Sequence, residues 1–225
     1  MKKLFIGMML LSSVFTGAAQ VKVSILGDSY STYEGWNPSH HDVWYGSANR
    51  NDVIDVKETW WYQLIDDNGL ELEKNNSWSG ATICNTGYNG ADFTDRSFLT
   101  RSGDLGNNPD VIFVFGGTND AWANSPLGNF DSSDMYSVRP ATKAMLKNIK
   151  ATYPEAVCMV IINTELSKDV ENTLVEACTM EEVPYVKLNA IDKQSGHPSV
   201  NGMKQISNQV WKATAPHLYK KLKTK

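Results

Sequence analysis

The sequence is poor in cysteine, and its three cysteines, Cys84, Cys158 and Cys178, follow no recognisable pattern. Their odd number and wide spacing exclude a complete disulfide framework and a CxxC metal motif. At least one thiol is therefore expected to be free. One disulfide remains open in an oxidising compartment, but we favour packing as small apolar side chains, because Cys158 falls in an apolar strand and Cys178 in a helical stretch.

The sequence also lacks an excess of charge of either sign. Lys and Arg number 21 against 25 Asp and Glu, and the formal net charge of -4 gives no electrostatic footprint for nucleic acid. The lysine-rich segment 220–225 is typical of a solvated helix terminus. No internal repeat or linker is present, and 41% hydrophobic with 20% charged residues is an ordinary globular composition. Nucleic acid is therefore not an expected partner.

Long apolar runs are absent except near the N-terminus. Lys2 and Lys3 precede an apolar run, residues 4–15, that is too short for a membrane span, and small residues follow it. This pattern predicts a signal peptide over residues 1–19 and one domain over residues 20–225, with a retained anchor as the alternative. No cysteine follows the small residues to carry a lipid. We therefore expect an exported protein, periplasmic or extracellular, without stable membrane insertion after cleavage.

Three apolar stretches predict buried parallel strands, over residues 21–26, 70–78 and 110–115. Each is followed by small or polar residues, and in an open α/β sheet the carboxyl ends of the strands form the ligand-binding edge. At these ends Ser29 is a candidate nucleophile, Gly80 lets its backbone approach a ligand, and the Asn119 amide suits a developing oxyanion. Taken singly, each motif also fits a turn or a helix cap.

The rest of the chain continues an α/β pattern, with helices expected over residues 58–68, 137–153, 167–180 and 200–212 and strands over 156–162 and 183–188. His197 follows the last strand, where Pro198 fixes an extended backbone and Ser199 caps the next helix, so we predict a general base there. The adjacent His40 and His41 have no carboxylate at a ligand spacing, and no metal site is expected.

A long loop, residues 30–58, is rich in aromatic side chains. Trp36, Trp44 and Tyr45 offer flat faces for sugar rings or acyl groups, and loops that leave the ligand-binding edge often carry function. The alternative is a lid that packs these rings as a satellite core. We list Trp36, Trp44 and Tyr45 as candidate substrate contacts.

In order along the chain, four short motifs resemble those of the SGNH subgroup of the GDSL hydrolase superfamily: Gly27-Asp28-Ser29, Gly80, Gly117-Thr118-Asn119-Asp120 and His197-Pro198. The resemblance implies a three-layer, flavodoxin-like α/β/α fold with a five-stranded parallel sheet, and ester hydrolysis through an acyl-enzyme without metal or cofactor. It assigns Ser29 as nucleophile and His197 as base. The oxyanion hole would consist of the Ser29 and Gly80 backbone N–H groups and the Asn119 amide.

One motif departs from the family. The usual aspartate three residues before the histidine is Gln194 here, and the nearest carboxylate is Asp192. Either Asp192 reaches His197 through a wider loop and completes a catalytic triad, or a backbone carbonyl near Gln194 or Ser195 holds the imidazole in a Ser-His dyad.

These observations together predict an exported serine esterase that acts on short O-acyl groups of carbohydrates, with a small molecule or polysaccharide ester as substrate. Two alternatives stay open. One is a lipid esterase or thioesterase of the same fold, and the other is a carbohydrate-binding module without catalysis. The oligomeric state has no signal in the sequence.

Overall fold

The computed structural model describes residues 20–223, so the predicted signal peptide at residues 1–19 lies outside the described residues. Five parallel strands form one sheet in the order β2-β1-β3-β4-β5. Their bounds are β1 Lys22–Gly27, β2 Glu71–Ser77, β3 Val111–Phe115, β4 Val157–Ile162 and β5 Tyr185–Lys187. All five strands predicted from the sequence are confirmed.

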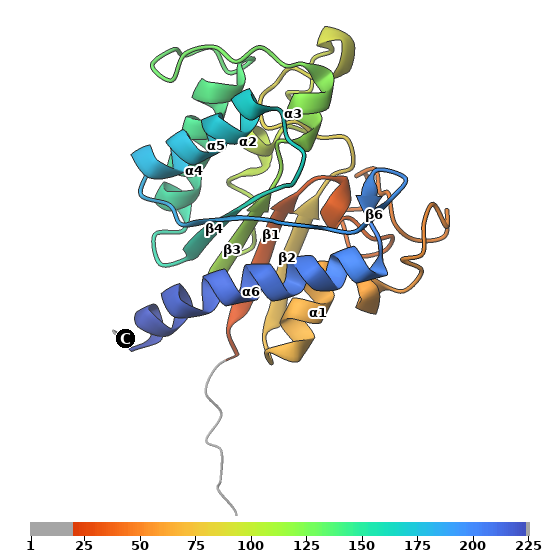
Figure 1. Ribbon diagram of the computed structural model, residues 1–225. Helices are drawn as coiled ribbons and strands as arrows, with labels where there is room; N and C mark the ends of the chain where they lie inside the picture. The colour runs from red at the N-terminus through yellow and green to blue at the C-terminus, as the bar shows by residue number, and fades with distance from the viewer. Residues whose placement is uncertain (1–19, 224–225) are drawn as a thin grey trace, which may run out of the picture.

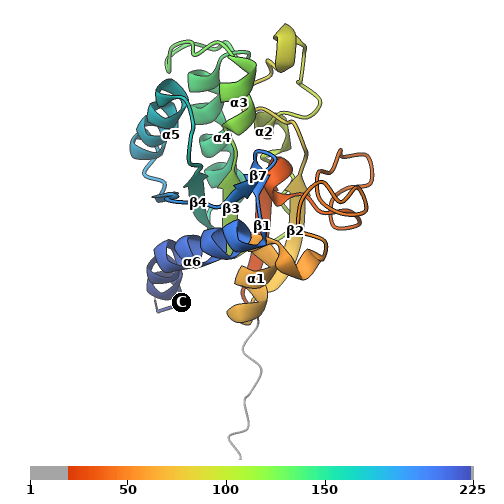
Figure 2. The same ribbon diagram turned by 45° about the vertical axis from the view of Figure 1, so that its right-hand side comes forward.

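The α-helices of the described chain are α1 Trp60–Asp67, α2 Phe98–Arg101, α3 Thr118–Ala123, α4 Val138–Thr152, α5 Lys168–Met180 and α6 Val200–Leu222. Helices α1 and α6 lie on one face of the sheet and α2, α4 and α5 on the other (Figure 1). Figure 2 shows the molecule turned by 45°, with α3 beyond the carboxyl end of β3. The predicted α/β/α fold is confirmed.

The central strand β3 shows why both faces of the sheet are covered. Its side chains alternate between the two cores, with Ile112 and Val114 packing beneath α4 and α5. Val111, Phe113 and Phe115 pack against α1 and α6. Because successive side chains of a strand point to opposite faces, a continuous apolar strand needs a helical layer on each side.

Helix α6 is longer than predicted, since it continues past residue 212 to Leu222 and contains Pro216. A proline inside a helix removes one backbone hydrogen bond. The buried Val210, Thr214 and Leu218 continue the packed face of α6 across this point. Burial of that face outweighs the missing bond, so the helix is not interrupted.

Two further elements lie in segments for which the sequence predicts neither a helix nor a strand. Helix α2 carries Arg101, which is 5% exposed. A short antiparallel pair, β6 Lys193–Gln194 and β7 His197–Pro198, surrounds the turn at Ser195 and Gly196, with φ of 53° and 74°. Positive φ at both central residues is the geometry of a type I′ hairpin turn.

All three cysteines are buried and free, as the preferred interpretation expected. Within residues 20–223, no helix combines the length and the apolar character needed to cross a membrane. The same residues contain no group of three or more His, Cys, Asp or Glu side chains placed to hold a metal ion.

Candidate active site

The carboxyl ends of β1, β2 and β3 meet at one edge of the sheet. The Asp28 N–H donates to the Phe115 carbonyl across 3.3 Å, and the Trp78 N–H donates to the Gly27 carbonyl across 3.0 Å. Gly27 is needed because a side chain there would collide with Ser77 and with the η1 turn (Ser29–Ser31). The three strand ends are therefore tied together directly beneath Ser29.

Ser29 begins the η1 turn and is 4% exposed. Asp28 caps this turn, since its carboxylate accepts the Tyr30 N–H across 3.0 Å. The Ser29 Oγ lies 2.9 Å from Nε2 of His197, although 168 residues separate the two in sequence. The fold thus brings the predicted nucleophile and the predicted base into hydrogen-bond contact.

The other imidazole nitrogen, Nδ1, lies 3.2 Å from the backbone carbonyl of Ser195. A carbonyl oxygen only accepts, so Nδ1 carries the proton and Nε2 is left to accept from Ser29. The hairpin turn that presents this carbonyl is held by Tyr30, whose hydroxyl donates to the Gly196 carbonyl across 2.7 Å. His197 therefore has the tautomer that a general base for Ser29 requires.

The environment of His197 favours its neutral form. Burial is the largest cause and lowers the pKa of His197 from 6.5 to about 4, with smaller contributions in the same direction from the positive charges of Arg50 and Lys193. The hydrogen bond to the Ser195 carbonyl acts in the opposite direction. A neutral imidazole at physiological pH is ready to accept a proton.

The structure does not bring Asp192 to the imidazole, which corrects its assignment as the orienting carboxylate. The Asp192 carboxylate instead accepts the hydroxyl proton of Ser199. Ser199 in turn caps α6 by accepting the Gly202 N–H across 3.1 Å. Asp192 is thus used at a helix cap, and the backbone carbonyl of Ser195 occupies the position beside Nδ1. This arrangement is the dyad alternative.

Asn119 is held with one amide N–H available. Its Oδ1 accepts the hydroxyl proton of Tyr88 across 2.7 Å, and its Nδ2 donates to the Ala81 carbonyl across 2.9 Å. An amide nitrogen has two N–H groups, so the second can donate to a substrate oxygen. The bond to Ala81 also places the Asn119 amide next to Gly80, the other predicted donor.

Gly80 has a φ of 82°, a conformation that favours glycine. The loop that carries it is fixed by Asp120, whose carboxylate accepts the N–H groups of Ile83 and Cys84 across 2.8 and 3.2 Å. Burial raises the pKa of the Asp120 carboxyl to about 6. Asp120, the residue after Asn119, therefore positions the loop that carries the backbone N–H of Gly80.

The structure separates the three aromatic residues that were predicted to contact substrate. Trp44 lies in the site, but its indole stacks on the His197 ring with centroids 3.7 Å apart and planes 9° apart. Tyr45 is buried, 2% exposed, and its hydroxyl donates to the Pro198 carbonyl across 3.0 Å. The assignment of Tyr45 as a stacking surface for substrate is wrong because its ring belongs to the core.

Trp36 is also not at the site. It is 42% exposed, but its ring packs on α1 against Trp61 and Tyr62, with centroids 5.6 and 5.9 Å away. It lines a hollow with Leu70 and Leu72, at the amino end of β2. Ser29 follows the opposite, carboxyl end of the neighbouring strand, so the substrate-contact assignment of Trp36 is corrected as well.

Three residues of the site were missed from the sequence. Trp122 is 49% exposed and lies edge-on to the His197 ring at 6.2 Å, whereas Tyr88 and Tyr30 anchor Asn119 and the hairpin. Trp122 follows Asn119 by three residues, so a helix turn starting at that strand end was the available signal. The tyrosine contacts depend on loop paths and leave no local signal.

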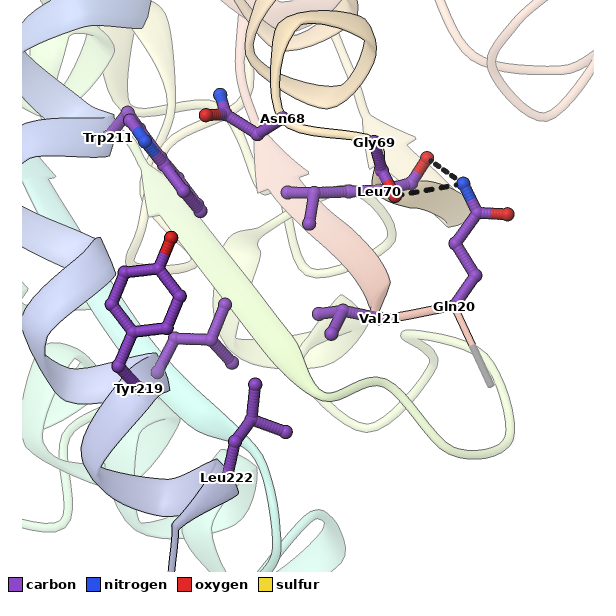
Figure 3. Close-up of a pocket in the computed structure, with 9 residues that line it drawn as sticks. Gln20, Val21, Asn68, Gly69, Leu70, Trp211, Tyr219 and Leu222 are labelled. Carbon is purple, nitrogen blue, oxygen red and sulfur yellow. Dashed lines mark hydrogen bonds between the residues drawn. The ribbon is translucent and has the colours of Figure 1, made fainter. Parts of the chain in front are cut away.

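A hollow of about 430 Å³ lies at the opposite end of the sheet from Ser29. Figure 3 shows Trp211 and Tyr219 of α6 on one side of it and Leu70, Val21 and Gln20 on the other. Gln20 donates to the carbonyls of Gly69 and Leu70 across 3.0 and 2.8 Å. None of the predicted site residues lines this hollow.

The comparisons with known proteins agree with this geometry. A family model for GDSL-like lipases and acylhydrolases matches residues 21–214. A crystal structure of a GDSL-like lipase from Bacteroides uniformis is 49% identical, covers 88% of this chain and 96% of that chain, and superposes with a TM-score of 0.85. One from Bacteroides ovatus is 43% identical over 88% and 100% of the two chains, with a TM-score of 0.85.

A family two carbohydrate esterase from Clostridium thermocellum, in complex with cellohexaose, is 18% identical over 88% of this chain and 65% of that chain. Its TM-score of 0.61 shows a shared fold. No curated protein sequence matches the chain. Because the family model spans nearly the whole described chain and its motifs meet at one edge of the sheet, the chain belongs to the GDSL-like lipase/acylhydrolase family of ester hydrolases.

Proposed function

We propose that this protein is an exported serine esterase that removes short acyl groups, above all O-acetyl groups, from carbohydrates. The observation that carries the proposal is the 2.9 Å hydrogen bond between Ser29 Oγ and Nε2 of a neutral His197. Nucleophile and base in direct contact, with the base held in the accepting tautomer, are what acyl transfer to serine requires. Family membership supports ester bonds as the substrate class.

In the proposed reaction, Ser29 Oγ attacks the ester carbonyl carbon and its proton passes to Nε2 of His197. The carbonyl oxygen becomes an oxyanion that accepts hydrogen bonds from the free amide N–H of Asn119 and the backbone N–H groups of Ser29 and Gly80. His197 then gives its proton to the leaving alcohol, which leaves an acyl-Ser29. A water molecule repeats the sequence and releases the carboxylic acid.

Trp122 supports a carbohydrate substrate. It is an exposed indole beside His197, and an indole face suits one side of a sugar ring. Two hollows have the volume for a longer acyl chain, about 430 and 460 Å³. The first lies at the amino ends of β1 and β2 and the second beside α4, so neither is lined by Ser29 or by the residues around it. The pattern of residues 1–19 supports export.

The second candidate is a lipid esterase or thioesterase, favoured by the near relatives that are called GDSL-like lipases. A series of p-nitrophenyl acetate, butyrate and octanoate separates the candidates, with Ser29→Ala as the control for enzymatic hydrolysis. We expect acetate to be hydrolysed fastest. A preference for octanoate would favour the lipid esterase, and absence of hydrolysis with retained oligosaccharide binding would favour the non-catalytic module.

The carbohydrate part is tested with Trp122→Ala. We expect this change to reduce kcat/KM on an acetylated xylo-oligosaccharide by about two- to tenfold and to leave p-nitrophenyl acetate nearly unaffected, since one stacking contact contributes roughly 0.5–1.5 kcal/mol. Trp36→Ala, which removes a tryptophan packed on α1, is the matched control. Equal losses on both substrates with Trp122→Ala would contradict a sugar contact.

A further inference from the structure

The proposed base has no carboxylate partner within the described structure. When His197 accepts the Ser29 proton it gains a full positive charge, which a triad carboxylate would stabilise. Here Nδ1 faces only the neutral Ser195 carbonyl, 3.2 Å away, and Asp192 is bonded to Ser199. Burial further disfavours the charged imidazole. The site therefore needs another source of stabilisation for the imidazolium.

Trp44 presents such a source. Its indole and the His197 ring lie nearly parallel, 9° apart, at a centroid distance of 3.7 Å. The rings of Tyr30, Tyr45 and Trp122 also lie near the imidazole, but at 5.0–6.2 Å and steep angles of 57–80°. The face of an aromatic ring is its negative pole and attracts a cation, with tryptophan the strongest of the natural rings.

The indole is held in this position from both sides of the site. The backbone N–H of Trp44 donates to Thr32 Oγ1 across 2.9 Å, just after the η1 turn that carries the nucleophile. The neighbouring Tyr45 packs edge-on against the indole at 4.7 Å and is bonded to the Pro198 carbonyl. The Arg50 guanidinium carbon lies 5.8 Å from the centroid of the same indole, within the range of a cation–π contact.

We propose that Trp44 is a positioning residue whose π face stabilises the imidazolium of His197, in the role that a carboxylate has in a Ser-His-Asp triad. This inference rests on the proposed Ser29–His197 esterase. Trp44 has two effects of opposite sign on the base: its bulk excludes water, which disfavours the charged ring, and its π electrons favour that ring. Truncation removes both effects, so the test must change only the second.

The test incorporates mono-, di- and trifluorinated tryptophan at position 44 of the full chain. Fluorine withdraws electron density from the ring face but hardly changes the size of the indole. We expect the pKa of His197, measured by NMR of labelled histidine, to fall stepwise by about one unit over the series, and kcat/KM for p-nitrophenyl acetate to fall about tenfold. The same series at Trp211 on α6, remote from the site, should change neither quantity.

The inference would be overturned if the pKa of His197 and kcat/KM both stayed constant over the series at position 44 in folded protein. Trp44 would then serve only to exclude water from His197. If wild-type protein hydrolysed no ester, the proposed function would fail, but the NMR titration of His197 would still decide the role of Trp44. Trp44→Phe is a second variant that keeps a weaker π face. It should retain more activity than Trp44→Leu, and the reverse order would also overturn the inference.

Discussion

At the scale of single residues, the candidate site depends on how the surroundings of His197 set its proton affinity. Burial makes the charged ring unfavourable, Arg50 and Lys193 add to this effect, and the Ser195 carbonyl opposes it. A base of low pKa is present in its reactive, neutral form over a wide pH range, but it is also a weaker proton acceptor. The stacked Trp44 ring is the contact best placed to reduce that second disadvantage.

The pH profile of the esterase follows from this. The pKa of His197 is lowered to about 4, so activity should appear as the pH rises through about 4 and be lost only below it. A histidine with an ordinary pKa of about 6.5 would give a midpoint about 2.5 units higher. The measurement is kcat/KM for p-nitrophenyl acetate in overlapping buffers. A midpoint above about 6 would show that His197 is not desolvated in solution.

The oxyanion donors provide a second prediction. Asn119→Ala should lower kcat by about 10²–10³ with little change in KM, because the amide acts on the transition state. Tyr88→Phe leaves the amide present but removes the donor to its Oδ1, so we expect a loss of roughly fivefold, as one hydrogen bond contributes about 1 kcal/mol. A change in KM alone for Asn119→Ala would indicate a substrate contact instead.

At the scale of elements, the β6–β7 hairpin positions the candidate base. Its two-residue turn directs the Ser195 carbonyl at Nδ1. Tyr30 holds the turn at Gly196, and Tyr45 holds β7 at Pro198. Asn51 adds a third, donating to the Pro198 carbonyl across 2.9 Å. The aromatic loop therefore positions the base and also adds the rings of Tyr30 and Tyr45 to the core, which agrees better with the packing alternative than with substrate stacking.

This hairpin predicts a mild effect of Asp192→Asn on catalysis. Asparagine keeps an oxygen that can accept from Ser199, so kcat should stay within a few-fold of wild type, and the free energy of unfolding should fall by about 1 kcal/mol as the charged acceptor is lost. Steady-state kinetics and urea unfolding measure the two effects. A loss of about 10³ or more in kcat would mean that Asp192 reaches His197 during turnover, as in a triad.

At the scale of the whole molecule, three buried groups and the partly buried His41 have opposing effects on the pH dependence of folding. Burial raises the pKa of Asp28 to about 7 and of Asp120 to about 6, so their contribution to stability is lost as the pH rises through those values. Burial lowers the pKa of His41 and of His197 to about 4, so their contribution is lost as the pH falls from 6.5 toward 4.

Between about pH 5 and pH 6 the native chain holds protons on the two aspartates and the unfolded chain on the two histidines, so the proton counts nearly cancel and stability should be flat. Asp28→Asn removes one native proton. Stability should then rise with pH by about 1.4 kcal/mol per unit in this window, because the unfolded chain binds more protons. Urea unfolding at several pH values tests this, with the exposed Asp131→Asn as control. A flat profile for Asp28→Asn would contradict it.

The sequence by itself determined the layers and the strand ends. The apolar strands of β1, β3 and β4 need cover on both faces wherever they lie, and the polar residues that follow them must then meet at the carboxyl edge. Ser29 after β1 and Asn119 after β3 could be predicted for this reason, and Gly80 after β2 and His197 after β5 could be predicted from the same edge together with the family motifs. Such patterns are local, because residues close together in the chain determine the backbone geometry and the need for burial.

Only the tertiary structure decided which side chains surround the base. Trp36, Trp44 and Tyr45 have similar chemistry and lie within ten residues, yet one packs on α1, one stacks on His197 and one enters the core. Asp192 could have bonded to His197 or to Ser199, and in the structure it accepts the hydroxyl proton of Ser199, the cap of α6. These outcomes depend on competition between contacts far apart in the chain, and that competition is resolved only when the whole fold is packed.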